Sequence, residues 1–343
     1  MKIELAVSAP LFTARHFYAC PGIVARRNPT SDFWYYNNSI GIKTEFYPDW
    51  TENDWSDPID CFLENADIQH IGILEREEIP AEVTRNCLQA FLAETLRADQ
   101  YIYYTNLDEY FIPHTRSFRQ RHFHHDGMIT GMDTEAKTIA ISLYSQRRVL
   151  ESVEIPFKQF RKALLSSLEA KPWPSFFLLR CLQTKLSLDS DRIKTALQSY
   201  REEKEPHSLI NRGKRFYQYH GINAYDGWIA FFEGAKSREF IWQGPAFLVF
   251  CEHKKCMAQR LLLLADAERS AGQRAIARLY YSTVYQGLEQ SRILYFKACF
   301  KDDKSVYEKL REKLAELKER EKKLLQEFSD IGEFAKKRLT LEE

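Results

Sequence analysis

The chain has 343 residues, of which 44% are hydrophobic, 14% aromatic and 28% charged. This composition is typical of folded proteins rather than disordered or fibrous ones, and the length predicts two domains. The formal net charge of +1 creates no global field that would attract nucleic acid or an acidic membrane. No segment approaches the ~20 apolar residues of a membrane span, and the seven cysteines lack regular spacing, so we expect reduced thiols and a cytoplasmic protein.

The first half of the chain predicts an α+β domain over residues 1–188 with an antiparallel sheet. Residues 2–7 predict a strand, Cys20–Val24 predicts a helix start, and residues 28–60 predict loops and short elements. Apolar spacing over residues 81–96 predicts a helix. Further along, the patterns predict strands at 100–104, 127–130, 138–143, 148–155 and 175–182, and a helix at 155–168.

The second half predicts an α-helical domain over residues 189–343. Ser187 or Asp189 would cap its first helix, and long apolar-periodic segments follow at 215–233, 245–268, 273–299 and 304–328. In the last segment the apolar positions are broken only by Glu321. We expect this helix to lie along a neighbour within the same chain rather than along a second copy.

Cys20 and His125 form the candidate catalytic pair. Pro21 suits the first position of a helix, so the thiol would lie at a helix N-terminus, where the dipole and unsatisfied N–H groups favour a thiolate. His125 opens an apolar run that predicts a strand. Papain-type catalysis pairs a helix-borne cysteine with a strand-borne histidine. The pattern therefore predicts Cys20 as nucleophile and His125 as base.

The segments LDEYFIP, HHDGMITGMD and CEHKKCMAQRLLLL resemble the family of the butirosin biosynthesis protein H N-terminal domain, which is a papain-like, acyltransferase-type family. The order of the cysteine and the histidine is also similar to that of bacteriocin-processing cysteine peptidases. The resemblance implies a papain-like domain that acts in bacterial specialised-metabolite biosynthesis, in nonribosomal peptide or antibiotic pathways.

The resemblance also implies roles for residues and partners. Cys20 would accept an acyl group from an acyl carrier protein or a peptidyl carrier domain, His125 would act as base, and a small-molecule amine would resolve the intermediate. With water in place of the amine, the same pair would hydrolyse its substrate, as a cysteine protease does. No cofactor is implied.

The chain departs from the family pattern around both residues. A glutamine for the oxyanion hole is expected several residues before the cysteine, where this chain has Thr13, Ala14 and Arg15. An Asp or Asn is expected to orient the histidine, and the next strand offers Ser145 and Gln146, preceded by Ser142 and Tyr144. A catalytically inactive scaffold or carrier-protein-binding module is therefore the alternative to an enzyme.

Other candidates have plainer interpretations beside the functional ones. Asp108, Glu109 and Asp126 could act as acid and base, although carboxylates at strand ends mostly face water. His122 and His124 would share one strand face and His125 the other. This separation argues against a metal site, and Cys251, His253 and Cys256 would diverge on a helix. We expect no metal.

Two clusters could serve a carrier-bound substrate. Phe33, Trp34, Tyr35 and Tyr36 could wall an acyl or phosphopantetheine channel, or pack in the core. Lys254, Lys255 and Arg260 could bind an acidic carrier protein, or form a solvated helix face.

Overall fold

The computed structural model describes residues 1–51, 57–170, 173–202, 204–235, 243–301, 303 and 305–342. The chain divides into two compact units. Unit 1 comprises Met1–Asp32 and Asp67–Leu186, and unit 2 comprises Phe33–Ala66 and Ser187–Glu343. Residue 188, the predicted boundary, lies close to the end of unit 1. Residues 33–66, which we expected in the first domain, belong to unit 2.

Unit 1 is built on a seven-stranded sheet in the order β4-β9-β5-β6-β7-β8, with β1 also paired to β6. Every strand pair is antiparallel, which confirms the predicted α+β class and antiparallel sheet. The strands are β1 (Lys2–Glu4), β4 (Leu74–Pro80), β5 (Tyr101–Asp108), β6 (His124–Asp133), β7 (Thr138–Tyr144), β8 (Leu150–Pro156) and β9 (Ser175–Cys181).

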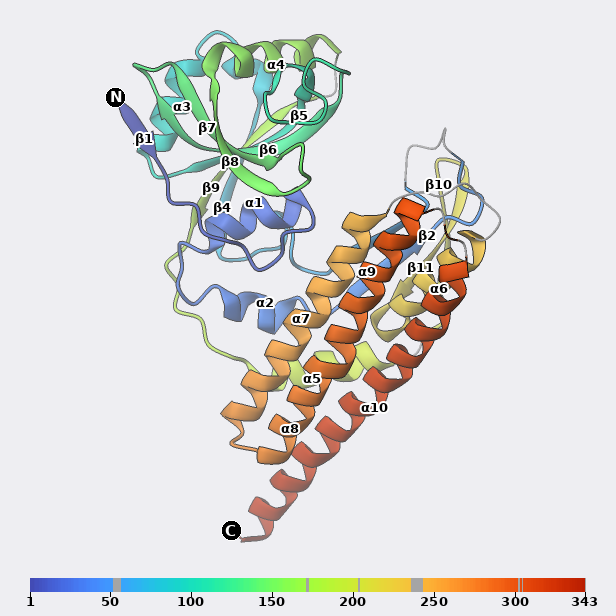
Figure 1. The fold of residues 1–343 in the computed structure, drawn as a ribbon. Coiled ribbons are helices and arrows are strands. Elements are labelled where there is room, and N and C mark those ends of the chain that lie inside the picture. Colours follow the sequence, from blue (N-terminus) through green and yellow to red (C-terminus); the bar gives the residue numbers. More distant parts are fainter. Residues whose placement is uncertain are drawn as a thin grey trace. The chain divides into compact units, whose positions relative to one another are not determined.

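Helices cover both faces of this sheet. Because successive strand residues point to opposite faces, neighbouring tyrosines of β5 identify the two sides. Tyr103 stacks with His16 of α1 at a centroid distance of 6.5 Å, whereas Tyr104 packs edge-on against Phe160 of α4 at 5.7 Å. In Figure 1, α1 lies on one side of the sheet and α3 and α4 on the other. The helical elements are α1 (His16–Ala25), η1 (Ala81–Thr84), α3 (Leu88–Arg97), η2 (Glu109–Phe111) and α4 (Phe157–Ala170).

The pairing of β5 with β6 is interrupted by a bulge. The register shifts between Tyr104 and Leu107, and Asn106 within the shift has a φ of 55°. Asparagine tolerates this left-handed conformation better than most residues. Bulges re-aim side chains next to functional sites, and the backbone N–H of Asn106 donates to Asp126 Oδ1 at 2.9 Å.

Unit 2 contains a second antiparallel sheet in the order β10-β11-β2-β3. Its strands are β2 (Ile42–Phe46), β3 (Ile59–Leu63), β10 (His207–Asn211) and β11 (Lys214–His220). The predicted α-helical domain at residues 189–343 therefore also contains two strands, β10 and β11, which the sequence patterns did not predict. The predicted helix at 215–233 is wrong in its first part, because residues 214–220 form β11.

The rest of unit 2 is helical, and its long helices appear in orange and red in Figure 1. The helical elements are α2 (Asp32–Asn38), α5 (Ser190–Arg201), η3 (Gly221–Asn223), α6 (Ala224–Ala235), α7 (Gly244–Ala267), α8 (Ala271–Tyr280), η4 (Tyr281–Tyr285), α9 (Gln286–Lys301) and α10 (Ser305–Glu342). Helix α10 contacts α6, α8 and α9. The predicted seam positions are buried, which confirms that this helix packs along neighbours within the chain; they are Tyr307, Leu310, Leu314, Leu317, Leu324 and Phe328.

The described helices include none that is both long enough and apolar enough to cross a membrane.

Candidate functional site

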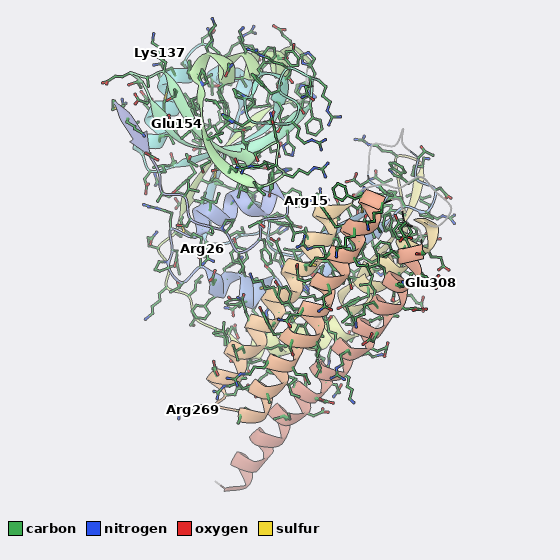
Figure 2. The ribbon with its side chains drawn as sticks, in the orientation of Figure 1. Arg15, Arg26, Lys137, Glu154, Arg269 and Glu308 are labelled. Atoms are coloured by element: carbon green, nitrogen blue, oxygen red, sulfur yellow. The ribbon has the colours of Figure 1, made fainter. Side chains whose placement is uncertain are left out.

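Helix α1 begins earlier than its sequence pattern predicts. It spans His16–Ala25 with Arg15 as its N-cap residue and Pro21 inside it, and the backbone N–H of Ala19 already donates to the Arg15 carbonyl oxygen at 2.8 Å. Figure 2 labels Arg15 and Arg26, which flank the helix at its two ends. The predicted helix start at Cys20 is wrong: Cys20 is in the second turn, and His16 occupies the first helical position.

Cys20 lies in the apolar core of unit 1. It is 1% exposed and packs in a cluster with residues such as Ile23, Ile129 and Ile141. Burial raises the pKa of the Cys20 thiol, and the negative charge of Asp126 raises it further. A buried thiol in apolar surroundings is inert as a nucleophile because the thiolate is disfavoured.

His125 lies at the start of β6, and a carboxylate from η2 orients its ring. Its Nδ1 lies 3.0 Å from Oε1 of Glu109, the first residue of η2. The His125 side chain is 25% exposed and that of Glu109 12%. The imidazole is therefore oriented by a neighbouring acid and remains accessible to solvent, as a general acid or base requires.

His16 is held by a second carboxylate. Its Nε2 lies 3.1 Å from Oδ2 of Asp126, and the two side chains are 20% and 19% exposed. Asp126 also accepts hydrogen bonds from the Tyr103 hydroxyl at 2.7 Å and from the Asn106 backbone N–H. Burial alone would raise the pKa of Asp126, but the hydrogen bonds from His16, Tyr103 and Asn106 and the nearby His16 ring lower it overall. Asp126 is thus a stable anion that fixes the His16 ring.

The two imidazoles are in contact. The ring centroids of His16 and His125 are 4.7 Å apart, with an interplanar angle of 75°. Burial lowers the pKa of His16, and the neighbouring His125 and Arg15 lower it further against the opposing effect of Asp126. His16 is therefore neutral at neutral pH and able to accept a proton.

The carboxylates also determine which ring nitrogens are left to react. An ionised carboxylate can only accept hydrogen bonds, so it pairs with the ring nitrogen of a neutral imidazole that bears the proton. Asp126 consequently favours the tautomer of His16 with its lone pair on Nδ1, and Glu109 favours the tautomer of His125 with its lone pair on Nε2.

A third carboxylate, that of Asp108, fixes the turn η2 that carries Glu109. The fully buried Asp108 accepts hydrogen bonds from Ser166 Oγ at 2.7 Å and from the Tyr110 backbone N–H at 3.1 Å, which caps η2. Nδ1 of His122 lies 2.6 Å from Asp108 Oδ2, the oxygen that also accepts from Ser166. Because Asp108 fixes the start of η2, it also fixes the backbone of Glu109, the partner of His125.

The residues predicted to complete the oxyanion hole or to orient His125 have other partners. The backbone oxygen of Thr13 accepts from the Tyr144 hydroxyl. The Ser145 hydroxyl donates to Glu151 at 3.0 Å, and the exposed Gln146 donates its backbone N–H to the His114 carbonyl at 2.7 Å. Glu109, which the sequence suggested only as an acid or base, takes the place next to His125.

The candidates on α7 are part of the core of unit 2. Lys254 and Arg260 are fully buried, so neither the predicted carrier-binding patch nor the solvated helix face is correct, although Lys255 is exposed. His253 Nε2 lies 2.8 Å from the Ile40 carbonyl oxygen. Cys251 and Cys256 are buried, and no metal-binding group of three His, Cys, Asp or Glu exists among the described residues.

Two of the four aromatic residues at positions 33–36 pack in the core of unit 2. Tyr35 and Tyr36 are buried on α2. The carbonyl oxygens of both residues accept hydrogen bonds from the guanidinium of Arg260, at 3.1 and 2.6 Å. For these two tyrosines, the core interpretation is confirmed.

Comparison of the chain with protein-family models gives no match, and neither does comparison with curated proteins. The residues of the site therefore carry the functional argument. His16 is the one that sequence reasoning missed. Its only signal was its place one helical turn before Cys20, and recognising it required knowing where α1 begins.

Proposed function

We propose that unit 1 carries a histidine acid–base site that transfers an acyl group from a thioester or amide to an amine or to water, without a covalent bond to Cys20. The contact between His16 and His125, each held by its own carboxylate, carries this proposal. The reaction class comes from the resemblance to papain-like acyltransferases, which also supplies a carrier-protein donor, an amine acceptor and a place in specialised-metabolite biosynthesis.

The two rings can divide the proton transfers of acyl transfer. His16 would remove the proton from the attacking amine or water through Nδ1 while the new bond to the acyl carbon forms. His125 would enter the step as an imidazolium ion with a proton on each nitrogen, and would give its Nε2 proton to the departing sulfur or nitrogen as the old bond breaks. This transfer would leave His125 in the tautomer that Glu109 favours. Transfer of the proton from His16 to His125 through solvent would then restore both rings. A positive charge on His125 lowers the pKa of His16. The charged His125 ring would therefore act as the acid and the neutral His16 ring as the base.

The burial of Cys20 supports the choice of histidine over thiol chemistry. An acyl-enzyme at Cys20 would need a thiolate and an acyl chain inside the apolar core, whereas His16 and His125 reach solvent. The same observation favours a second candidate, a carrier-protein-binding scaffold without catalysis. In that case the carboxylates and histidines would serve only to hold α1 and η2 in place.

The test is turnover of an acyl-N-acetylcysteamine thioester with an amine acceptor, followed by mass spectrometry, with a peptide amide as the protease substrate. His16→Gln and His125→Gln should each lower kcat/KM by about 10²- to 10⁴-fold, the usual contribution of an acid or base. Cys20→Ala is the matched control and should retain activity. Loss of activity in Cys20→Ala with activity retained in His16→Gln would establish thiol chemistry instead. No turnover by the wild-type protein would favour the scaffold.

A further inference from the structure

Two neighbouring loops of unit 1 concentrate arginine side chains. The arginine surface, as we call it, consists of Arg116, Arg119 and Arg121 from the connection between η2 and β6, and Arg147 and Arg148 from the turn between β7 and β8. All five residues are exposed. Residues 113–123 and 145–149 contain no aspartate or glutamate, although the chain as a whole is nearly neutral.

One backbone hydrogen bond joins the two loops, and further hydrogen bonds order the first of them. The Gln146 N–H donates to the His114 carbonyl oxygen at 2.7 Å, and the Arg119 N–H donates to the Tyr110 carbonyl oxygen at 3.0 Å. Thr115 is buried, and its hydroxyl donates to the Ile112 carbonyl oxygen at 2.9 Å. The arginines are thus displayed on an ordered support, which reduces the entropy cost of binding.

The charge of this surface is only partly neutralised within the chain. Arg147 pairs with Glu151 at 2.7 Å. In the described part of the chain, Arg116, Arg119 and Arg121 form no ion pair. Burial lowers the pKa of Arg148, and the positive charge of Arg116 lowers it further, as expected where like charges are close. An anionic partner would relieve this repulsion.

Aromatic rings lie beneath two of these arginines. The guanidinium of Arg119 lies over the Phe118 ring at 5.0 Å, and that of Arg121 over the Phe123 ring at 5.2 Å. Phe123 is itself 40% exposed. Arginines combined with exposed aromatic rings are characteristic of protein–protein interfaces, where lysine is depleted.

We infer that the arginine surface is the docking site of a protein partner with an acidic face. Planar guanidinium groups match carboxylates in bidentate pairs, and the surface contains arginine but no lysine. It extends over two loops, and none of its residues lines the 620 Å³ depression beside α3, so an extended acidic partner fits it better than a small anion. Nucleic acid is less well matched, because the overall charge of +1 gives no broad basic field.

The inference goes beyond the proposed chemistry of the histidines and can be tested without it. The probe is a fluorescein-labelled oligo-glutamate peptide, whose binding to the full chain is followed by fluorescence anisotropy at low and at physiological salt. An oligonucleotide of equal charge is the competing probe. The variant is Arg116→Gln/Arg119→Gln/Arg121→Gln, and the matched control removes three exposed charges from α4, in Lys158→Gln/Arg161→Gln/Lys162→Gln.

The arginine variant should weaken peptide binding at least about tenfold, and added salt should weaken binding by the wild-type protein. The α4 variant should bind as the wild-type protein does, and circular dichroism should show both variants folded. The inference is overturned if the peptide does not bind, if both variants bind it equally, or if the oligonucleotide binds more tightly than the peptide.

Discussion

Lys254 and Glu321 form an ion pair in the interior of unit 2, with Nζ and Oε2 3.0 Å apart and neither side chain exposed. The hydroxyls of Tyr200, Tyr225 and Tyr280 all donate to the Glu321 carboxylate, at 2.9, 2.7 and 2.7 Å. Five buried polar groups from five helices thus satisfy one another. Such a network specifies one packing of the helices, because a shifted helix would leave a charge unpaired.

Glu321→Gln should therefore destabilise the protein by about 3–5 kcal/mol, because it leaves the Lys254 charge buried without a counterion. Urea unfolding followed by circular dichroism measures this change. Glu319→Gln, at an exposed position of the same helix, is the control and should change stability by less than about 0.5 kcal/mol. Adding Lys254→Met to Glu321→Gln should recover part of the loss. If Glu321→Gln and Glu319→Gln changed the free energy of unfolding equally, a structural role for the Lys254–Glu321 pair would be contradicted.

His16 should titrate below its ordinary pKa of 6.5, since burial and the His125 ring both disfavour its charged form. NMR titration of the histidine ring signals measures this pKa. Asp126→Asn should lower it further by removing the anion that favours the imidazolium, whereas His125→Gln should raise it by removing a competing charge. If His16 is the base, kcat/KM should rise as pH increases through its pKa. A pKa at or above 6.5 would contradict this assignment.

Cys87 should be the first cysteine to react with iodoacetamide in the native protein. It is exposed, whereas Cys20, Cys61, Cys251 and Cys256 are buried, and burial raises the pKa of Cys299 to about 12. Peptide mass spectrometry after brief labelling at neutral pH identifies the modified sites. Cys20 should react only after urea is added, and His125→Ala should not change its rate. Rapid, His125-dependent labelling of Cys20 would restore the thiol mechanism.

A fragment of residues 189–343 should not fold alone. It lacks β2 and β3, which supply half of the four-stranded sheet of unit 2. A fragment that joins residues 33–66 to 187–343 through a flexible Gly/Ser linker contains the whole unit and should fold cooperatively. Circular dichroism and thermal unfolding distinguish the two. A cooperative transition in the shorter fragment would show that the helices alone form a stable core.

The sequence predicts best the elements in which apolar residues alternate as in a strand or recur as in a helix. Strands β7 and β8 and helix α4 lie within a few residues of their predicted ranges, and Asp189 caps α5 as expected, accepting from the Arg192 N–H at 3.0 Å. Helix α3 ends near its predicted end but begins at Leu88 rather than at residue 81, because residues 81–84 form the separate turn η1. These elements have one face in an apolar core, so the burial pattern appears directly in the residue types.

Strands β10 and β11 were missed because their pattern is weak. Every residue of β10 is exposed, so no alternation marks it, and β11 is followed after only three residues by the apolar-periodic helix α6, with which the sequence pattern merged it. The turn between them contains Arg212 and Gly213, both with positive φ. This backbone suits a tight hairpin, but a single glycine after an arginine is a weak signal for it.

The site was only half predictable for a different reason. His125, Glu109 and Asp126 were visible as residue types at strand ends, but their pairing depends on the bulge at Asn106 and on the start of α1. Pro21 marked a helix start in the sequence, yet it lies inside α1. That shift moves Cys20 into the core and brings His16 to His125.

The assignment of residues 33–66 to unit 2 also determines the order in which the protein can mature during synthesis. All of unit 1 has been made once Leu186 is added, but β2 must wait for β11, its partner strand. Until then β2 and β3 form an isolated hairpin, which is marginal in water, with Ile42, Ile59 and Leu63 lacking the cover they have in the finished protein. Because α6 and α7 also contact β2 and β3, this apolar surface lacks its full cover from the synthesis of Leu63 until that of Ala267. We expect the nascent chain to be prone to aggregation over this interval.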